Sequence, residues 1–232
     1  SNNNIKNIEA NTKLSVVTNE YKKNVGDTVT FSIITNNAIS DITYSSSDST
    51  VAKIVSSDKN MVKVKVNKVG TATITAQQCS KSVSVKFNVD KAKCIDISEW
   101  NCDINFNKVR KAGVTCVIIR AGYGKDPNQE DNEFQKYYKQ AKAAGLNVGA
   151  YWYSYATSVD AAKAEVRNCM KTIQGKESYP DELASKYLIW IAAPNTSYSD
   201  LPSYVDLWQY SWTGPVDGIR GDVDLNYIYN LN

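Results

Sequence analysis

Two carboxylates occupy unusual places in this sequence. Asp96 lies between two isoleucines in the run CIDIS, and Asp224 lies between a valine and a leucine in GDVDLN. An acid within an apolar strand is costly unless it is paired or faces a polar interior. Either acid alone could cap a loop at the edge of a strand. The two together predict a polar interior that holds a pair of carboxyl groups, which is the equipment of acid–base catalysis.

A second pair of acids, Asp181 and Glu182, follows Tyr179-Pro180 directly. Neighbouring residues on a strand point to opposite faces, so these two could not act together from a strand. The short amphipathic segment after them favours a helix start, where acids are common.

The remaining composition limits the chemistry further. The chain of 232 residues contains no histidine, which excludes a Ser-His-Asp or Cys-His nucleophile. The five cysteines form no Cys-x-x-Cys pair, so a zinc site is not expected, and neither a metal nor a cofactor is implied. Cys94, Cys116 and Cys169 fall in apolar or helical patterns and predict buried thiols, although a Cys94–Cys102 disulfide stays open.

Charge and hydropathy also limit the partners. The net charge of +3, from 27 basic and 24 acidic residues, does not predict a nucleic-acid partner. It is compatible with an anionic polymer such as a cell wall. No apolar run approaches the ~18 residues of a membrane span, so membrane insertion is not expected. The start, SNNNIKNIEA, lacks the regions of a signal peptide and is interpreted as a mature or trimmed end.

The two halves of the chain differ in their pattern of apolar and polar residues, and the acids Asp96 and Asp224 lie in the second half. Residues 13 to about 90 alternate apolar and polar positions, with turn residues between the runs. In MVKVKV the pattern places Val62, Val64 and Val66 inward and the two lysines outward. About seven short strands predict a β-sandwich.

From Lys93 onward, strand-like runs alternate with helical ones. Two of the expected helices end at a glycine, Gly113 or Gly145, and Ser158 is the expected N-cap of a third. This alternation predicts a parallel sheet or barrel, in which functional residues gather where strands end.

Both halves resemble known families. The runs TYSSSDSTVAKI and VGTATITA resemble the bacterial immunoglobulin-like domains of group 2, which implies an extracellular spacer or adhesion module. The second half resembles glycoside hydrolase family 25, the lysozyme-type N-acetylmuramidases. The matching runs are IDISEWN, VIIRAGYG, FQKYYKQAKAAGLNVGAYWYSYA, YLIWIA and LWQYSWTGPVDGIRGDVDLN.

The second resemblance implies an irregular β/α barrel that acts on the glycan of peptidoglycan. According to this resemblance, Asp96 and Asp224 correspond to the first and last active-site aspartates of the family. It also implies aromatic and polar residues that bind the sugar, namely Tyr123, Tyr151, Tyr153, Trp208 and Glu99. Trp190, between two isoleucines, is interpreted as core packing. The chemistry of the residues agrees, because glycoside hydrolysis needs one protonated and one ionised carboxyl group.

One part of the family pattern is missing. The family carries an Asp-x-Glu pair at the end of its fourth strand, shortly after a Tyr-Pro. Here the segment DELASKYLIWIA follows Pro180 at once and aligns with a later helix and the sixth strand. Six strands are expected where a barrel needs eight, and residues 93–232 fall below the ~200 residues of ordinary barrels.

Three interpretations of the Pro180–Asp181 junction stay open. The sequence could be joined across a segment that it does not represent, which would leave an ordinary muramidase. The deletion could be real, which would leave a remodelled or partner-completed barrel that binds glycan without cleaving it. Finally, Asp181 and Glu182 could replace the lost pair.

We therefore expect two domains, an Ig-like sandwich over 1–91 and a barrel-like α/β domain over 92–232. The expected function is a secreted, cell-wall-associated muramidase whose partner is the glycan strand. The alternative is an inactive glycan-binding or adhesion protein, so enzymatic activity is left open with a preference for hydrolysis.

Overall fold

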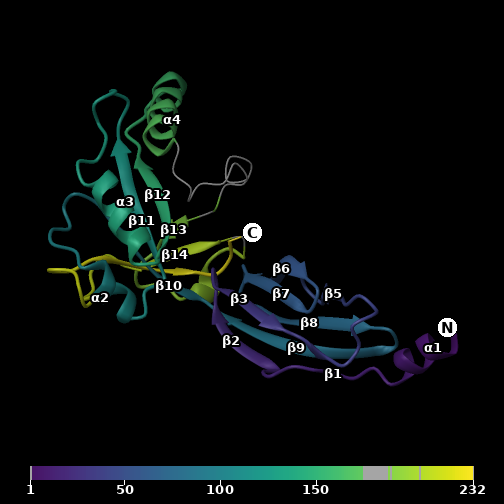
Figure 1. The fold of residues 1–232 in the computed structure, drawn as a ribbon. Helices are drawn as coiled ribbons and strands as arrows, with labels where there is room; N and C mark the ends of the chain where they lie inside the picture. Colours follow the sequence, from purple (N-terminus) through teal and green to yellow (C-terminus); the bar gives the residue numbers. More distant parts are fainter. Residues whose placement is uncertain (1, 175–187, 189, 204, 232) are drawn as a thin grey trace. The chain divides into compact units, whose positions relative to one another are not determined.

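The chain divides into two compact units. The computed structural model describes residues 2–174, 188, 190–203 and 205–231 (Figure 1). One unit comprises Ser1–Lys91 together with Tyr229–Asn232, and the other comprises Ala92–Ile228. Within the described ranges, no helix is both long and apolar enough to cross a membrane.

The first unit is built almost wholly of strands. After helix α1 (Asn2–Ala10), its strands are β1 (Leu14–Ser15), β2 (Glu20–Asn24), β3 (Thr28–Ser32), β4 (Ile34–Thr35), β5 (Thr43–Ser46), β6 (Ala52–Asp58), β7 (Met61–Val66), β8 (Gly70–Gln78) and β9 (Lys81–Asp90). They form a sheet of order β2-β9-β8-β5, a sheet of order β3-β7-β6, and the small pair β1-β4. The period-two pattern therefore gives strands as expected, and the Ig-like assignment stays a prediction.

The core of this unit follows from alternation. Val62, Val64 and Val66 of β7 are at most 1% exposed, as predicted, and the lysines between them face solvent. Phe31 and Phe87 pack ring against ring at 6.2 Å between centroids. Burying a side chain of this size stabilises a fold by roughly 1.5–3 kcal/mol.

The last residues of the chain make their contacts in the first unit, although the sequence pattern assigns them to the second. The amide of Val69 donates to the carbonyl of Tyr229, and the amide of Leu231 donates to the carbonyl of Asn67.

The second unit alternates strands and helices before its last strands. Its elements are β10 (Ala92–Ile97), α2 (Phe106–Lys111), β11 (Cys116–Tyr123), α3 (Phe134–Ala143), β12 (Asn147–Tyr153), α4 (Val159–Ile173), β13 (Trp190–Ala192), the 3-10 helix η2 (Tyr198–Asp200), β14 (Leu207–Ser211) and β15 (Asp224–Ile228). The predicted cap of α4 is confirmed, because the Ser158 hydroxyl accepts from the amide of Ala161. Gly113 and Gly145 follow α2 and α3 with φ of +89° and +75°, as C-terminal glycines do.

The six strands form one sheet of order β12-β11-β10-β15-β14-β13. β10 pairs in parallel with β11, and β11 with β12, as the alternation predicts. β15 is different, because it runs antiparallel to both β10 and β14. Among the described residues the strand order ends at β12 and β13 without closing. The α/β fold and the six strands agree with the expectation, whereas the expectation of all-parallel strands is wrong, because β15 makes the sheet mixed.

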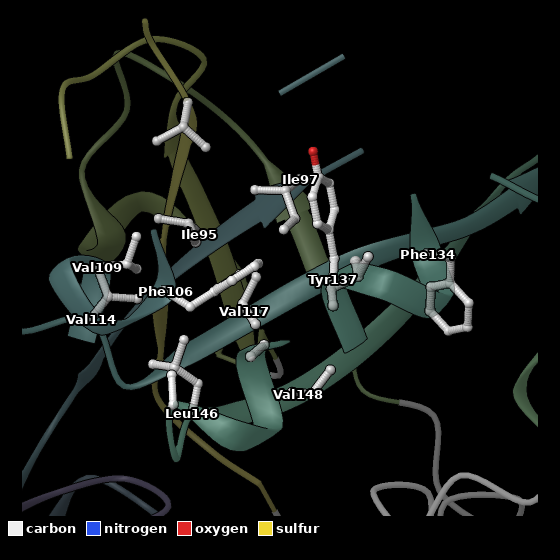
Figure 2. Packing of buried hydrophobic residues seen from close by; sticks show 14 of the residues in the cluster. Ile95, Ile97, Phe106, Val109, Val114, Val117, Phe134, Tyr137, Leu146 and Val148 are labelled. Atoms are coloured by element: carbon white, nitrogen blue, oxygen red, sulfur yellow. The ribbon is translucent and has the colours of Figure 1, made fainter. Parts of the chain in front are cut away.

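One face of this sheet packs under helices α2 and α3. Phe106 of α2 and Tyr137 of α3 meet edge to face, with 5.8 Å between ring centroids. Figure 2 shows their cluster, in which the strand residues point toward the helices. Ile95 and Ile97 lie on this face of β10, so Asp96 between them points to the opposite, inner face.

Candidate active site

The inner face of the sheet brings the two predicted aspartates together. The register of β10 against β15 places Asp96 directly opposite Asp224. The two carboxyl groups share a hydrogen bond, and Asp96 is 5% exposed. The structure thus pairs the two acids that stand in apolar strands of the sequence.

Burial changes the acidity of this pair. Desolvation raises the pKa of Asp96 to about 7, the Asp224 carboxylate adds to the rise, and a hydrogen bond from Asn226 opposes it. Desolvation also raises the pKa of Asp224, against hydrogen bonds to Asp96 and Gln209. Two carboxylates in contact cannot both ionise easily, so the pair keeps one proton up to a higher pH than an isolated aspartate would.

Asn226 and Trp190 continue this hydrogen-bonded chain. The Asn226 side chain donates from Nδ2 to Oδ2 of Asp96 at 2.6 Å. Its Oδ1 accepts from the indole N–H of Trp190 at 2.9 Å. The sequence pattern assigned Trp190 to core packing, whereas the structure connects it to the carboxyl pair.

Trp190 also meets Tyr151 across the inner face. The two rings contact edge to face with 5.7 Å between centroids. Tyr151 belongs to β12 and Trp190 to β13, which are the two end strands of the sheet. The sheet therefore curls until side chains of its first and last strands touch. Burial raises the pKa of the Tyr151 phenol, and the Asp96 charge raises it further.

Glu99 lies in an ion-pair network rather than free in the site. Its carboxylate accepts from Arg120 Nη2 at 2.8 Å and from the Asn132 amide. Arg120 also donates from Nε to Asp131 at 2.8 Å. The guanidinium lies over the ring of Tyr123, 5.2 Å from its centroid. This network ties together the loops that follow β10 and β11.

Tyr153 stands on the loop side of β12. It contacts Tyr155 with 5.1 Å between ring centroids, and both side chains are more than half exposed. The loop beneath them is held by Glu165 of α4, which accepts from the Ser154 hydroxyl and from the amide of Tyr155. The two tyrosines form an exposed aromatic surface on a fixed support.

Trp208 is not brought to the carboxyl pair. It alternates with Gln209, which hydrogen-bonds to Asp224, so the two side chains leave β14 on opposite faces. Trp208 contacts Tyr198, Tyr210 and Tyr227, and its indole donates to the carbonyl of Ala193 at 3.1 Å.

The other predictions about site chemistry have mixed outcomes. Cys94 is buried and Cys102 exposed, both as free thiols, so the disulfide left open for this pair does not form. Asp181 and Glu182 lie outside the described residues. In the part of the chain that the structure describes, no group of three or more acids or cysteines could hold a metal ion.

Sequence reasoning missed Arg120, Asp131 and Asn226. Arg120 carried a usable signal, because a charged residue within the apolar run VIIRAG needs a buried partner as much as Asp96 does. Asn226 and Asp131 carried none beyond their nearness to strand ends.

The match to a known protein family falls in the second half of the chain, which contains the candidate site. Residues 95–184 match the family described as Glycosyl hydrolases family 25. The "Autolytic lysozyme" of Clostridium acetobutylicum is 26% identical over 179 residues, which cover 58% of this chain and 55% of that protein. "Lysozyme M1" of Streptomyces globisporus is 24% identical over 195 residues, which cover 57% and 66%. This chain thus spans between about half and two thirds of these relatives.

Solved structures share the fold at lower identity. The modular autolysin LytC of Streptococcus pneumoniae, in complex with a synthetic peptidoglycan ligand, superposes with a TM-score of 0.52 and 21% identity. The superposition covers 77% of this chain and 57% of the LytC chain. The spore cortex lytic enzyme SleM of Clostridium perfringens gives a TM-score of 0.51 and 17% identity, covering 60% and 67%.

The first alignment is longer than the part of this chain that it covers. The first relative aligns over 179 residues, but 58% of this 232-residue chain is about 135 residues. Part of the relative's aligned span therefore has no counterpart in this chain.

Proposed function

We propose that the second unit acts on the glycan strands of peptidoglycan as a lysozyme-type muramidase. The observation that carries the proposal is the pair of Asp96 and Asp224 on the inner face of the sheet, in a unit whose residues 95–184 match glycosyl hydrolases family 25. The similarity to an autolytic lysozyme supports the same substrate. The reaction needs no cofactor.

Within this proposal, the carboxyl pair supplies a proton near neutral pH and accepts hydrogen bonds from the sugar. Tyr151 beside the pair and Tyr153 at the loop end offer aromatic faces that stack on sugar rings. Tyr123 and Glu99 both contact Arg120, and through these contacts they help to order the loops beside the sugar site. Trp208 is left out of the sugar site because it faces the other way.

The geometry of the pair also favours a second candidate function. Retaining glycosidases hold their two carboxyl groups about 5–5.5 Å apart, and inverting enzymes hold them further apart. Asp96 and Asp224 lie directly opposite each other on paired strands and each affects the acidity of the other, so they act as one coupled pair rather than as two independent carboxyl groups. A third carboxyl group is needed for hydrolysis, and the predicted loss of the Asp-x-Glu strand would remove it. Glycan binding without cleavage is therefore the second candidate.

The wider setting is proposed on the same basis. We infer that the first unit is an Ig-like spacer and that the protein works outside the cell, in contact with the wall. The autolysin and lysozyme relatives support a site of action at the wall.

The test starts from the mass of the purified chain. A mass near 25.8 kDa shows that the protein has no further segment between Pro180 and Asp181. The protein is then mixed with purified peptidoglycan, and three quantities are measured: loss of turbidity, release of reducing ends, and the protein fraction that sediments with the wall. The variant is Asp224→Asn, and the matched control is Asp222→Asn, an exposed aspartate two residues away.

Each result separates the candidates. Turbidity loss with new reducing ends, abolished in Asp224→Asn but kept in Asp222→Asn, supports hydrolysis at this site. Sedimentation with the wall without new reducing ends supports the binding function. A chain that neither sediments nor releases reducing ends overturns both.

A further inference from the structure

The indole N–H of Trp190 ends the hydrogen-bonded chain that begins at the carboxyl pair. An asparagine amide has two nearly equal ends, an oxygen that accepts and a nitrogen that donates. With Trp190 donating to Oδ1, only the Nδ2 end of Asn226 can face Asp96. We propose that Trp190 is a positioning residue that fixes the orientation of the Asn226 amide and so keeps a donor directed at Asp96.

The orientation of this amide decides which form of Asp96 is favoured. A donor at 2.6 Å from Oδ2 stabilises the ionised carboxylate. If the amide turned over, its oxygen would face Asp96 and would accept from the protonated carboxyl group. The same side chain would then stabilise the opposite protonation state. Trp190 thus acts on Asp96 through Asn226 without touching it.

The surroundings of Asp96 give the amide this influence. The charged or titratable groups that interact with Asp96 are Asp224 of β15, Cys94 of its own strand and Tyr151 of β12. Cys116 of β11 interacts with Cys94, and Arg120 of β11 interacts with Tyr151. Arg120 is committed to Glu99 and Asp131. Among the described residues, the Asn226 amide is therefore the neutral donor that the structure directs at Asp96.

A substitution at Trp190 can remove the indole N–H and still keep an aromatic ring at this position. Its ring packs edge to face on Tyr151, and a phenylalanine keeps an aromatic ring for that contact. The variant Trp190→Phe therefore removes the hydrogen bond to Asn226 with little change in packing. Trp152 offers a matched control, because its indole donates to the carbonyl of Gly124 at 3.0 Å and has no link to Asp96.

The test is a titration of the full chain labelled with carbon-13 at the aspartate carboxyl carbons. The Asp96 resonance is the one that is absent from Asp96→Asn. We expect Trp190→Phe to raise the apparent pKa of Asp96 by about one pH unit, the effect of losing one hydrogen bond to a carboxylate. Trp152→Phe should leave it unchanged. In an Asn226→Ala background, Trp190→Phe should have no further effect.

Two results overturn the proposal: an unchanged Asp96 titration in Trp190→Phe, or a shift of equal size when Asn226 is already alanine. The inference rests on the proposed function only for its use in turnover, since it concerns the same carboxyl pair. The titration is measured without glycan, so a failure to hydrolyse peptidoglycan does not affect its outcome.

Discussion

Asp96 should make the second unit less stable as pH rises. Its pKa is 3.8 for an ordinary aspartate and about 7 in the fold. Between these values the folded protein keeps a proton that the unfolded chain has released. The free energy of unfolding therefore falls with rising pH, by about 1.4 kcal/mol per pH unit. Over about three pH units the free energy of unfolding falls by roughly 4 kcal/mol, and it falls no further above about pH 7.

The variant Asp96→Asn should remove this loss. The asparagine has the shape of the protonated acid, its nitrogen can donate to Asp224, and its oxygen can accept from Asn226. The variant should match the natural protein near pH 4. By pH 8 it should be more stable by up to roughly 4 kcal/mol.

Tryptophan fluorescence is a suitable probe for this measurement. All five tryptophans lie in the second unit, so urea unfolding followed by fluorescence reports that unit alone. Titrating the natural protein, Asp96→Asn and the exposed control Asp222→Asn from pH 4 to 8.5 gives the three stability curves. The reasoning is refuted if the difference between the first two curves does not grow with pH, or if Asp222→Asn shows the same gain.

Two further predictions concern loops and charges that support the site. Gly145→Ala should destabilise the protein more than Gly113→Ala, as measured by urea unfolding. Both positions have positive φ, but a Cβ at Gly145 would overlap Nη1 of Arg110, whereas Gly113 has nothing within 4 Å. Equal losses would show that the Arg110 side chain moves aside freely. Arg120→Met should cost about 3–5 kcal/mol at neutral pH, because it leaves the buried Asp131 carboxylate and a second acid without their cation. A loss below about 1 kcal/mol would contradict a buried ion-pair network.

The sequence was most informative where structure is decided by near neighbours. The helix start at Ser158 and the helix ends at Gly113 and Gly145 depend on backbone groups a few residues away. The valines of β7 follow from strict alternation. These features need no knowledge of the rest of the chain, because capping and alternation are local rules.

The arrangement of the site could not be obtained in this way. Asn226 donates to Asp96 from 130 residues along the chain, and nothing near either residue specifies the partner. Their contact depends on β15 entering the sheet antiparallel beside β10. The alternation rule does separate Trp208 from Gln209, but it does not say which of the two faces inward. The apolar neighbours of Asp96 and Asp224 and the resemblance to a family both indicated these two acids, whereas the partners of Arg120 are evident only in the three-dimensional structure.

The return of the chain to the first unit has a mechanical consequence. The chain passes from the first unit to the second at Lys91–Ala92 and returns at Ile228–Tyr229. Ala92 and Ile228 are paired residues at one end of the β10–β15 ladder. A tensile force applied between these two crossing points would open that ladder from its end, one pair of hydrogen bonds at a time. Asp96 and Asp224 form the last pair of the same ladder, so they would be the last to separate under load.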